Sequence, residues 1–157
     1  MPGRNGELPL DLETFLCFAI YSTNHAFNRI YQPLLEELGL TYPQYIAMVL
    51  LWERDGQTVG ELGQRLSLES STLTPLLKRL ESLGHLTRRR SAADERQVHI
   101  FLTDSGRKLR QGAVGVPRCI LDATGMDGKE SKRLLTEIGA LREALEKYHS
   151  TQSGGEH

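Results

Sequence analysis

The segment from Thr58 to Gly106 constrains the fold of this chain more than any other stretch. A capping box, Thr58-x-x-Glu61, opens one short helix, and a second follows in which leucines recur every three or four residues. Alternating residues then predict strands over 85–90 and 97–102, joined by a polar loop at 91–94. Two short helices followed by a hairpin are the elements of a helix-turn-helix with a wing.

The side chains of this predicted winged helix-turn-helix, over 42–106, suit a DNA surface. A recognition helix enters the major groove by its N-terminal end, where small hydroxyls and methyls can meet base edges. The second helix begins with such residues: Ser70, Ser71, Thr72 and Thr74. Basic residues that suit phosphates follow: Lys78, Arg79, Arg88, Arg89 and Arg90. At the hairpin tip Arg96 can enter a narrow minor groove, with Asp94 holding its guanidinium.

Simpler explanations exist for the separate parts. Helix capping alone accounts for Ser70, and a run of arginines is often only a solvated surface. The charge distribution favours DNA, because residues 78–96 hold six basic and three acidic side chains, a balance of +3, in a chain of net charge −1. No capping rule accounts for a helix pair followed by a basic hairpin with Asp-x-Arg at its tip.

The remaining sequence predicts long helices on either side. One runs over 11–38, with Asp11 as N-cap and a bend at Pro33, and another over 127–149, capped by Asp127. The latter has a heptad-like apolar seam: Leu134, Ile138, Leu141 and Leu145. Between them, Thr103 caps a helix that glycines and Pro117 should kink. Residues 1–10 and the tail from 150 are expected to be loose.

Composition sets the broad class. The 157 residues, 39% hydrophobic and 25% charged, predict one mainly α-helical (α+β) domain over 1–157. The chain has no apolar run of membrane-spanning length and no apolar leader, and two cysteines make no disulfide framework. We therefore expect a cytoplasmic protein with reduced thiols, no membrane partner, no cofactor and no metal site.

The run E-L-x-x-R-L-x-L-x-S-S-T-L-T-x-L-L-x-R-L-E-x-x-G over 61–84, followed by D-E-R and L-T-D-S-G, resembles the MarR family of winged-helix regulators. The resemblance extends over nearly the whole chain. It implies a homodimer whose first and last helices interdigitate, here 11–38 and 127–149. It also implies binding to double-stranded palindromic operators, usually as a repressor.

Cys17 lies on the flank of the first predicted helix, about 40° on the helical wheel from Tyr21 and from Tyr31. A free cysteine on a helix is usually a small buried hydrophobe. Tyrosine hydroxyls, however, can donate hydrogen bonds to a thiolate and lower its pKa. Tyr21 is one turn away. Tyr31 is about 21 Å along the axis, so it cannot reach its own Cys17, but it could reach a partner's if the two first helices cross antiparallel.

The motifs L-C-F-A-I-Y-S-T and L-T-Y-P-Q-Y resemble one MarR branch, the organic hydroperoxide resistance regulators (OhrR). That resemblance implies that organic hydroperoxides oxidise Cys17 and that Tyr31, Tyr42 and Tyr21 stabilise its thiolate. In two-cysteine members a resolving cysteine of the partner, here Cys119, forms an intersubunit disulfide that releases DNA.

Three alternatives stay open at this point. Cys119 can be a core cysteine without a role. The chain can be a MarR-type repressor released by a small aromatic ligand, with structural cysteines. A thiol peroxidase is a further possibility, but the winged helix-turn-helix disfavours it, so we expect no enzyme and no catalytic residues.

Overall fold

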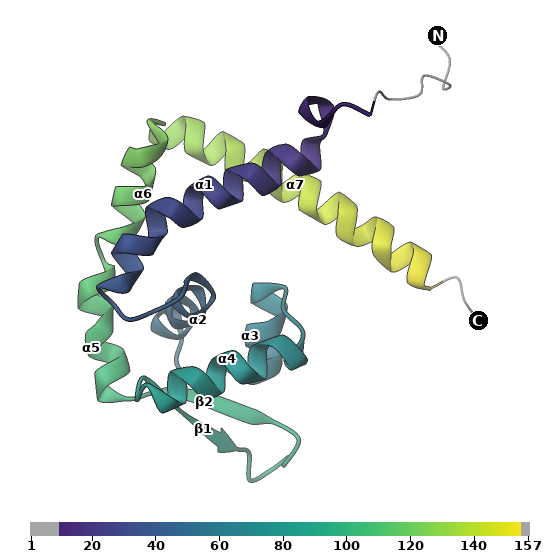
Figure 1. Cartoon of the computed structure of the whole chain (residues 1–157). Coiled ribbons are helices and arrows are strands. Elements are labelled where there is room, and N and C mark those ends of the chain that lie inside the picture. The colour runs from purple at the N-terminus through teal and green to yellow at the C-terminus, as the bar shows by residue number, and fades with distance from the viewer. Residues whose placement is uncertain (1–9, 155–157) are drawn as a thin grey trace. The chain divides into compact units, whose positions relative to one another are not determined.

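The computed structural model describes residues 10–154, which form a short 3-10 helix, seven α-helices and a two-stranded hairpin (Figure 1). The elements, in order, are η1 (Leu12–Thr14), α1 (Leu16–Glu36), α2 (Tyr42–Glu53), α3 (Val59–Leu66), α4 (Ser70–Ser82), β1 (Leu86–Arg90), β2 (Val98–Leu102), α5 (Asp104–Ala113), α6 (Val116–Thr124) and α7 (Gly128–Ser153). The predicted mainly helical class with a hairpin wing is confirmed. The chain divides into two compact units, Met1–Val116 and Pro117–His157, which are described separately below.

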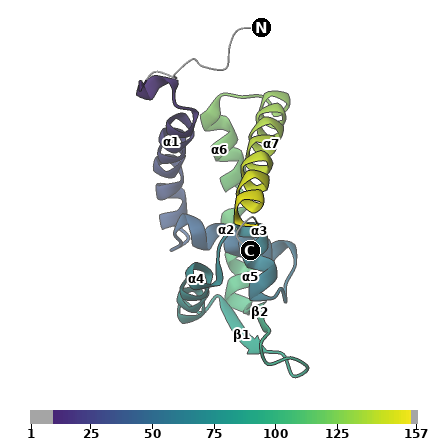
Figure 2. The same cartoon turned by 90° about the vertical axis from the view of Figure 1, so that its right-hand side faces the viewer.

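The core of the first unit joins α2, α3, α4 and the hairpin (Figure 2). Its largest fully buried side chains come from each of these elements: Met48, Leu51, Leu62, Leu73, Leu77, Leu80, Leu86 and Ile100. The predicted inward face of α4 is therefore confirmed at three of its leucines. Leu83, also expected inside, is 39% exposed, because α4 ends at Ser82 and Gly84, at a φ of +81°, turns the chain away.

β2 forms a second set of backbone hydrogen bonds, on the edge opposite β1, that the sequence did not indicate. β1 and β2 are antiparallel, with Leu86 opposite Leu102 and Arg90 opposite Val98. On the other edge of β2, the Gly56 N–H donates to the Ile100 carbonyl at 3.0 Å and the Ile100 N–H donates to the Gln57 carbonyl at 2.8 Å. β2 is thus the central strand, and β1 is the free edge of the wing.

The first helix begins later than predicted. Asp11 does act as an N-cap, but for η1, where its carboxylate accepts from the Glu13 N–H. Phe15 is then extended, and α1 starts at Leu16. The helix continues through Pro33 and ends at Glu36, ahead of the predicted Leu38, with Gly39 in the left-handed conformation at a φ of +66°.

The later helices match most of their predicted ends. Thr58, Thr103 and Asp127 are N-caps, as expected. Thr41 also caps α2, where its hydroxyl accepts from the Gln44 N–H. The predicted irregular fifth helix is divided into α5 and α6 by a turn at Val114 and Gly115.

The second unit comprises most of α6 and all of α7, and α7 extends past the predicted end at His149 to Ser153. The expectation of a disordered tail is wrong for 150–153, where the Ser150 and Ser153 hydroxyls donate to carbonyls four residues earlier, at 2.8 and 3.0 Å. The expected loose residues 1–9 and the tail residues 155–157 lie outside the described part of the chain. Across residues 10–154, no helix has the length and apolarity needed to span a membrane.

Candidate DNA-binding surface and cysteine site

The predicted base-reading residues gather at the start of α4. Ser70, Ser71 and Thr72 are exposed there, and Thr74 is half-buried. The N-cap residue, Glu69, makes no side-chain hydrogen bond to the first-turn N–H groups, so these donors are left free of a cap. Pro75 is the sixth residue of α4, so its missing N–H leaves the Ser71 carbonyl without its usual donor within the helix.

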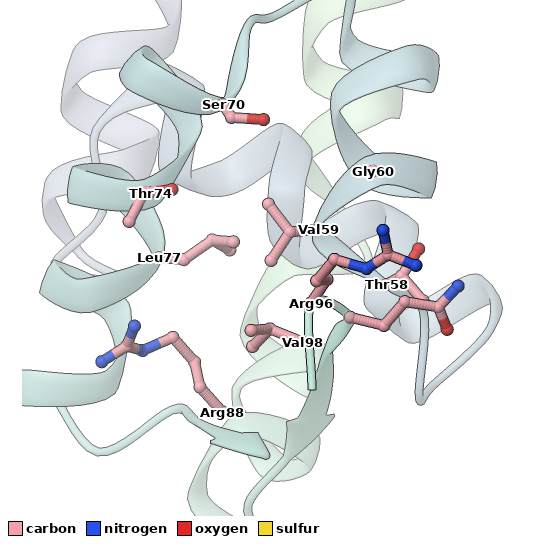
Figure 3. Close-up of a pocket in the computed structure, with 10 residues that line it drawn as sticks. Thr58, Val59, Gly60, Ser70, Thr74, Leu77, Arg88, Arg96 and Val98 are labelled. Atoms are coloured by element: carbon pink, nitrogen blue, oxygen red, sulfur yellow. The ribbon is translucent and has the colours of Figure 1, made fainter. Parts of the chain in front are cut away.

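A groove of about 440 Å³ separates α4 from the start of α3 and the wing. Ser70, Thr74 and Leu77 line it from α4, while Arg96 and Val98 line it from the wing (Figure 3). Gln97, which the sequence analysis did not single out, also lines this groove. Its only sequence signal is its position next to Arg96.

The predicted contact between Asp94 and Arg96 is present. Both the backbone N–H and the Nε of Arg96 donate to Asp94 Oδ1, at 3.1 Å each. The Arg96 side chain is nonetheless 92% exposed, so its charge is held in place without being buried. This arrangement orders an arginine at the tip of a hairpin, ready for a polyanion.

The three consecutive arginines of β1 have different environments. Arg88 donates from Nε to Glu81 Oε2 at 2.9 Å, which ties it to α4. The Arg89 guanidinium lies 5.2 Å from the centre of the Phe101 ring, a cation–π contact. Arg90 is exposed near the tip of the hairpin. Lys78 and Arg79, which lie on α4, are also exposed. Strand alternation turns Arg89 to the opposite face from its two neighbours.

Both cysteines are free thiols with exposed side chains, Cys17 in the first turn of α1 and Cys119 in α6. Tyr21, one turn after Cys17, is 61% exposed and meets the His25 ring edge to face at 4.4 Å between centroids. Since Cys17 and Tyr31 lie in one continuous helix, fourteen residues apart, they are about 21 Å from each other in the same chain.

Tyr31 belongs to an aromatic cluster between α1 and α2. Its ring centroid is 4.8 Å from that of Tyr42 and 6.0 Å from that of Tyr45. Burial, followed by the electrostatic effect of Tyr42 and Tyr45, raises the pKa of Tyr31 to about 12. Tyr31 therefore keeps its proton at neutral pH and remains a hydrogen-bond donor.

The structure thus brings together two of the three predicted thiolate-stabilising tyrosines and adds Tyr45, which the sequence analysis did not single out. Tyr31 and Tyr42 also line a hollow of about 590 Å³, with Asn24 and Asn28 on its α1 side. Within residues 10–154, no group of three or more His, Cys, Asp or Glu side chains is arranged to hold a metal ion.

Comparisons with known proteins place this surface in a family. The family model "Transcriptional regulator SarA/Rot" matches residues 29–112. The chain is 49% identical to the HTH-type transcriptional regulator TtmR of Methylorubrum extorquens, over 87% of this chain and 70% of the relative. It is 44% identical to the organic hydroperoxide resistance transcriptional regulator of Bacillus subtilis, over 87% of this chain and 92% of the relative.

Solved structures agree with that assignment. The structure of reduced AbfR bound to DNA has a TM-score of 0.71 and 35% identity, covering 83% of this chain and 91% of the other. The protein therefore belongs to the SarA/Rot-type regulators of the MarR family and is a DNA-binding winged-helix transcriptional regulator. Its similarity to the Bacillus regulator supports a position in the organic hydroperoxide resistance branch.

Proposed function

We propose that this protein is a homodimeric repressor that holds palindromic operator DNA when reduced and releases it when an organic hydroperoxide oxidises Cys17. The observation that carries the proposal is the exposed Cys17 thiol on α1, in a chain 44% identical to a regulator named for organic hydroperoxide resistance. The solved forms of AbfR, which include a reduced, a disulfide-containing and an overoxidised protein at 33–36% identity, add support.

The first chemical step consumes one peroxide. The Cys17 thiolate attacks an oxygen of the hydroperoxide, the O–O bond breaks, and the alcohol leaves after taking up a proton. Sulfur is oxidised to a sulfenic acid, and the peroxide is reduced. In the second step the Cys119 thiolate of the partner subunit attacks this sulfur, the S–S bond forms, and the S–O bond breaks. The hydroxide leaves as water after taking up a proton.

The tyrosines serve the first step. A phenol that keeps its proton can donate a hydrogen bond to a thiolate and so favour the reactive form of cysteine. Tyr31 has this property, with a pKa raised to about 12. It cannot reach Cys17 of its own chain, so we assign Tyr31, with Tyr42 beside it, to the partner's Cys17 and Tyr21 to its own.

Release of DNA follows from dimer geometry. Two recognition helices must match successive major grooves, about 34 Å apart. A disulfide between subunits pulls on α1 and α6, the helices that carry the two cysteines. The turn at Val114 and Gly115 lies just before α6, and a shift there would remove the two α4 helices from the spacing that the operator requires.

The second candidate is a repressor released by a small aromatic ligand, and the hollow of about 590 Å³ beside Tyr31 and Tyr42 favours it. It predicts no role for either thiol. A third alternative, turnover as a thiol peroxidase, predicts repeated cycles with a reductant, whereas a sensor reacts once per oxidation.

The deciding experiment measures binding to an operator duplex, defined as the palindrome that the reduced wild type selects from random-sequence DNA. Wild type, Cys17→Ser and Cys119→Ser are compared before and after one equivalent of cumene hydroperoxide per subunit, with non-reducing gels. We expect release and a disulfide-linked dimer in the wild type only. A peroxide response that persists in Cys17→Ser, or unmodified Cys17 with DNA still bound in the treated wild type, would sink the redox proposal.

A further inference from the structure

The free edge of the wing is held by one side chain of α4. β1 has no strand on its outer side within the described residues. There the backbone N–H of Arg88 donates to Glu81 Oε1 at 3.1 Å, and Arg88 Nε donates to Glu81 Oε2 at 2.9 Å. One carboxylate therefore fixes both the backbone and the guanidinium of the same strand residue.

This pair is less exposed than the other ion pairs of the helix-turn-helix. The side chains of Arg88 and Glu81 are 30% and 34% exposed, compared with 61% and 44% for Arg54 and Glu61. The hydrogen bond from the Arg88 guanidinium, followed by the one from its backbone, holds the pKa of Glu81 below its usual range. Glu81 is therefore ionised at neutral pH, in a contact that solvent screens only in part.

We propose that Glu81 is a positioning residue for DNA recognition, which acts through Arg88 to fix the angle between the wing and α4. This inference rests on DNA binding, which the family establishes, and not on the redox proposal. β2 is already fastened on its far side, by Gly56, Gln57 and the Asp55 carboxylate, which accepts from the Leu102 N–H at 2.8 Å. Glu81 supplies the matching attachment for β1.

A small rotation of the wing about this attachment displaces the tip of the hairpin. The hairpin loop begins three residues after Arg88, or about 10 Å at roughly 3.3 Å per residue, so a rotation of about 10° at Arg88 moves the tip by roughly 2 Å. A displacement of that size breaks hydrogen bonds from Arg96 to DNA, which require donor–acceptor distances near 3 Å.

The proposal changes the role assigned to Arg88. A direct phosphate contact predicts that removing the Glu81 charge strengthens DNA binding, because a competing anion is lost. A positioning role predicts the opposite sign. Glutamine at 81 offers one acceptor oxygen and turns a donor NH₂ toward the second Arg88 donor, so the double attachment is lost while size is kept.

The test measures the Kd of reduced protein for the operator duplex in wild type, Glu81→Gln, Arg96→Ala and the double variant. Glu95→Gln, an exposed carboxylate in the hairpin loop, measures the effect of charge loss alone. We expect the Kd of Glu81→Gln to be about tenfold higher than that of the wild type, the order of one lost groove contact. In the double variant, Glu81→Gln should add little to the loss of affinity that Arg96→Ala causes alone. Glu95→Gln should bind as tightly as the wild type or more tightly.

A Kd for Glu81→Gln that is unchanged or lower would overturn the proposal, and so would a loss that adds fully to that of Arg96→Ala. Should Glu81→Gln not fold, Arg88→Lys decides the question. Lysine keeps the charge but has no guanidinium Nε to bond Glu81 Oε2. Retained affinity in Arg88→Lys would then favour a phosphate contact and contradict positioning, whereas a similar tenfold loss would support it. None of these outcomes involves peroxide.

Discussion

The position of Tyr31 on α1 can be predicted from sequence, but the residues that surround it cannot. Helical spacing alone places it about 40° from Cys17 on the wheel and about 21 Å along the axis. Its neighbours Tyr42 and Tyr45 come from α2, after a turn at Gly39, and only packing of α1 on α2 brings the three rings together. The raised pKa follows from that packing.

We expect Tyr31 to ionise late when pH is raised, because burial raises its pKa to about 12. Because its pKa is raised in the folded state, the unfolded chain ionises first, near pH 10. The contribution of neutral Tyr31 to stability is therefore fully present below pH 10 and is lost as pH rises towards about 12. Tyrosinate absorbance followed against pH checks this: Tyr31→Phe should remove a late step.

Tyr148→Phe is the matched control, because Tyr148 is 67% exposed on α7. It should leave the late step unchanged. Burial also raises the pKa of Tyr45, so part of the late absorbance can remain in Tyr31→Phe. A late step of undiminished height in Tyr31→Phe would show that the cluster does not hold the Tyr31 proton as described.

Among the elements, α5 illustrates how a helix start is fixed by contacts on two sides. Thr103 caps it locally, through a hydrogen bond from the Gly106 N–H to its hydroxyl at 3.0 Å. The Trp52 indole then donates to the Gly106 carbonyl at 2.9 Å. On the other side the His85 backbone lies so close that a Cβ at Gly106 would collide with the His85 carbonyl oxygen.

We predict that Gly106→Ala lowers the free energy of unfolding by about 2 kcal/mol or more, since the backbone of His85, just before β1, must move away from α5 to admit the methyl group. Urea unfolding followed by the fluorescence of Trp52, the only tryptophan in the sequence, gives the measurement. Gly128→Ala, at the first position of α7 with no atom within 4 Å of the added Cβ, should stay within about 1 kcal/mol of wild type. Equal midpoints for the two variants would contradict the close approach at Gly106.

At the scale of the whole molecule, α1 and α7 each expose apolar side chains to solvent in a single chain. Leu16, Ile20 and Ile30 on α1 are 42–60% exposed. On α7, Ile138 and Leu145 of the heptad seam are 47% and 61% exposed. Surfaces of this kind mark a protein interface, which agrees with the dimer that the proposed function requires.

Ile138→Glu should therefore give a monomer, because it places a charge in the seam. Sedimentation should show half the wild-type mass. Affinity for the operator duplex should fall by about 100-fold, since the second half-site is no longer held by the same particle. Leu135→Glu, next to the seam and already 70% exposed, should remain dimeric and bind DNA. Dimeric Ile138→Glu would exclude this seam from the interface.

Features that depend on near neighbours along the chain could be predicted from the amino-acid order. Capping residues fixed the starts of α2, α3, α5 and α7, and the leucine spacing of α4 fixed its buried face. The Asp94–Arg96 contact was also predictable, because a two-residue separation leaves few geometries for that pair. The break at Phe15 was not, since Asp11 offers the same cap to a 3-10 turn as to a longer helix.

Which groups distant in sequence come into contact depends on the tertiary structure and could not be predicted from sequence. Gly56 and Gln57 pair with β2 from more than forty residues away, and Tyr45 joins Tyr31 across two helices. Glu81 and Arg88 lie seven residues apart, but only the turn at Gly84 directs Arg88 to α4 while Arg89 turns to Phe101. Local propensity predicts the backbone conformation that a residue prefers. It does not predict which residue it contacts, because that contact depends on the packing of the whole unit.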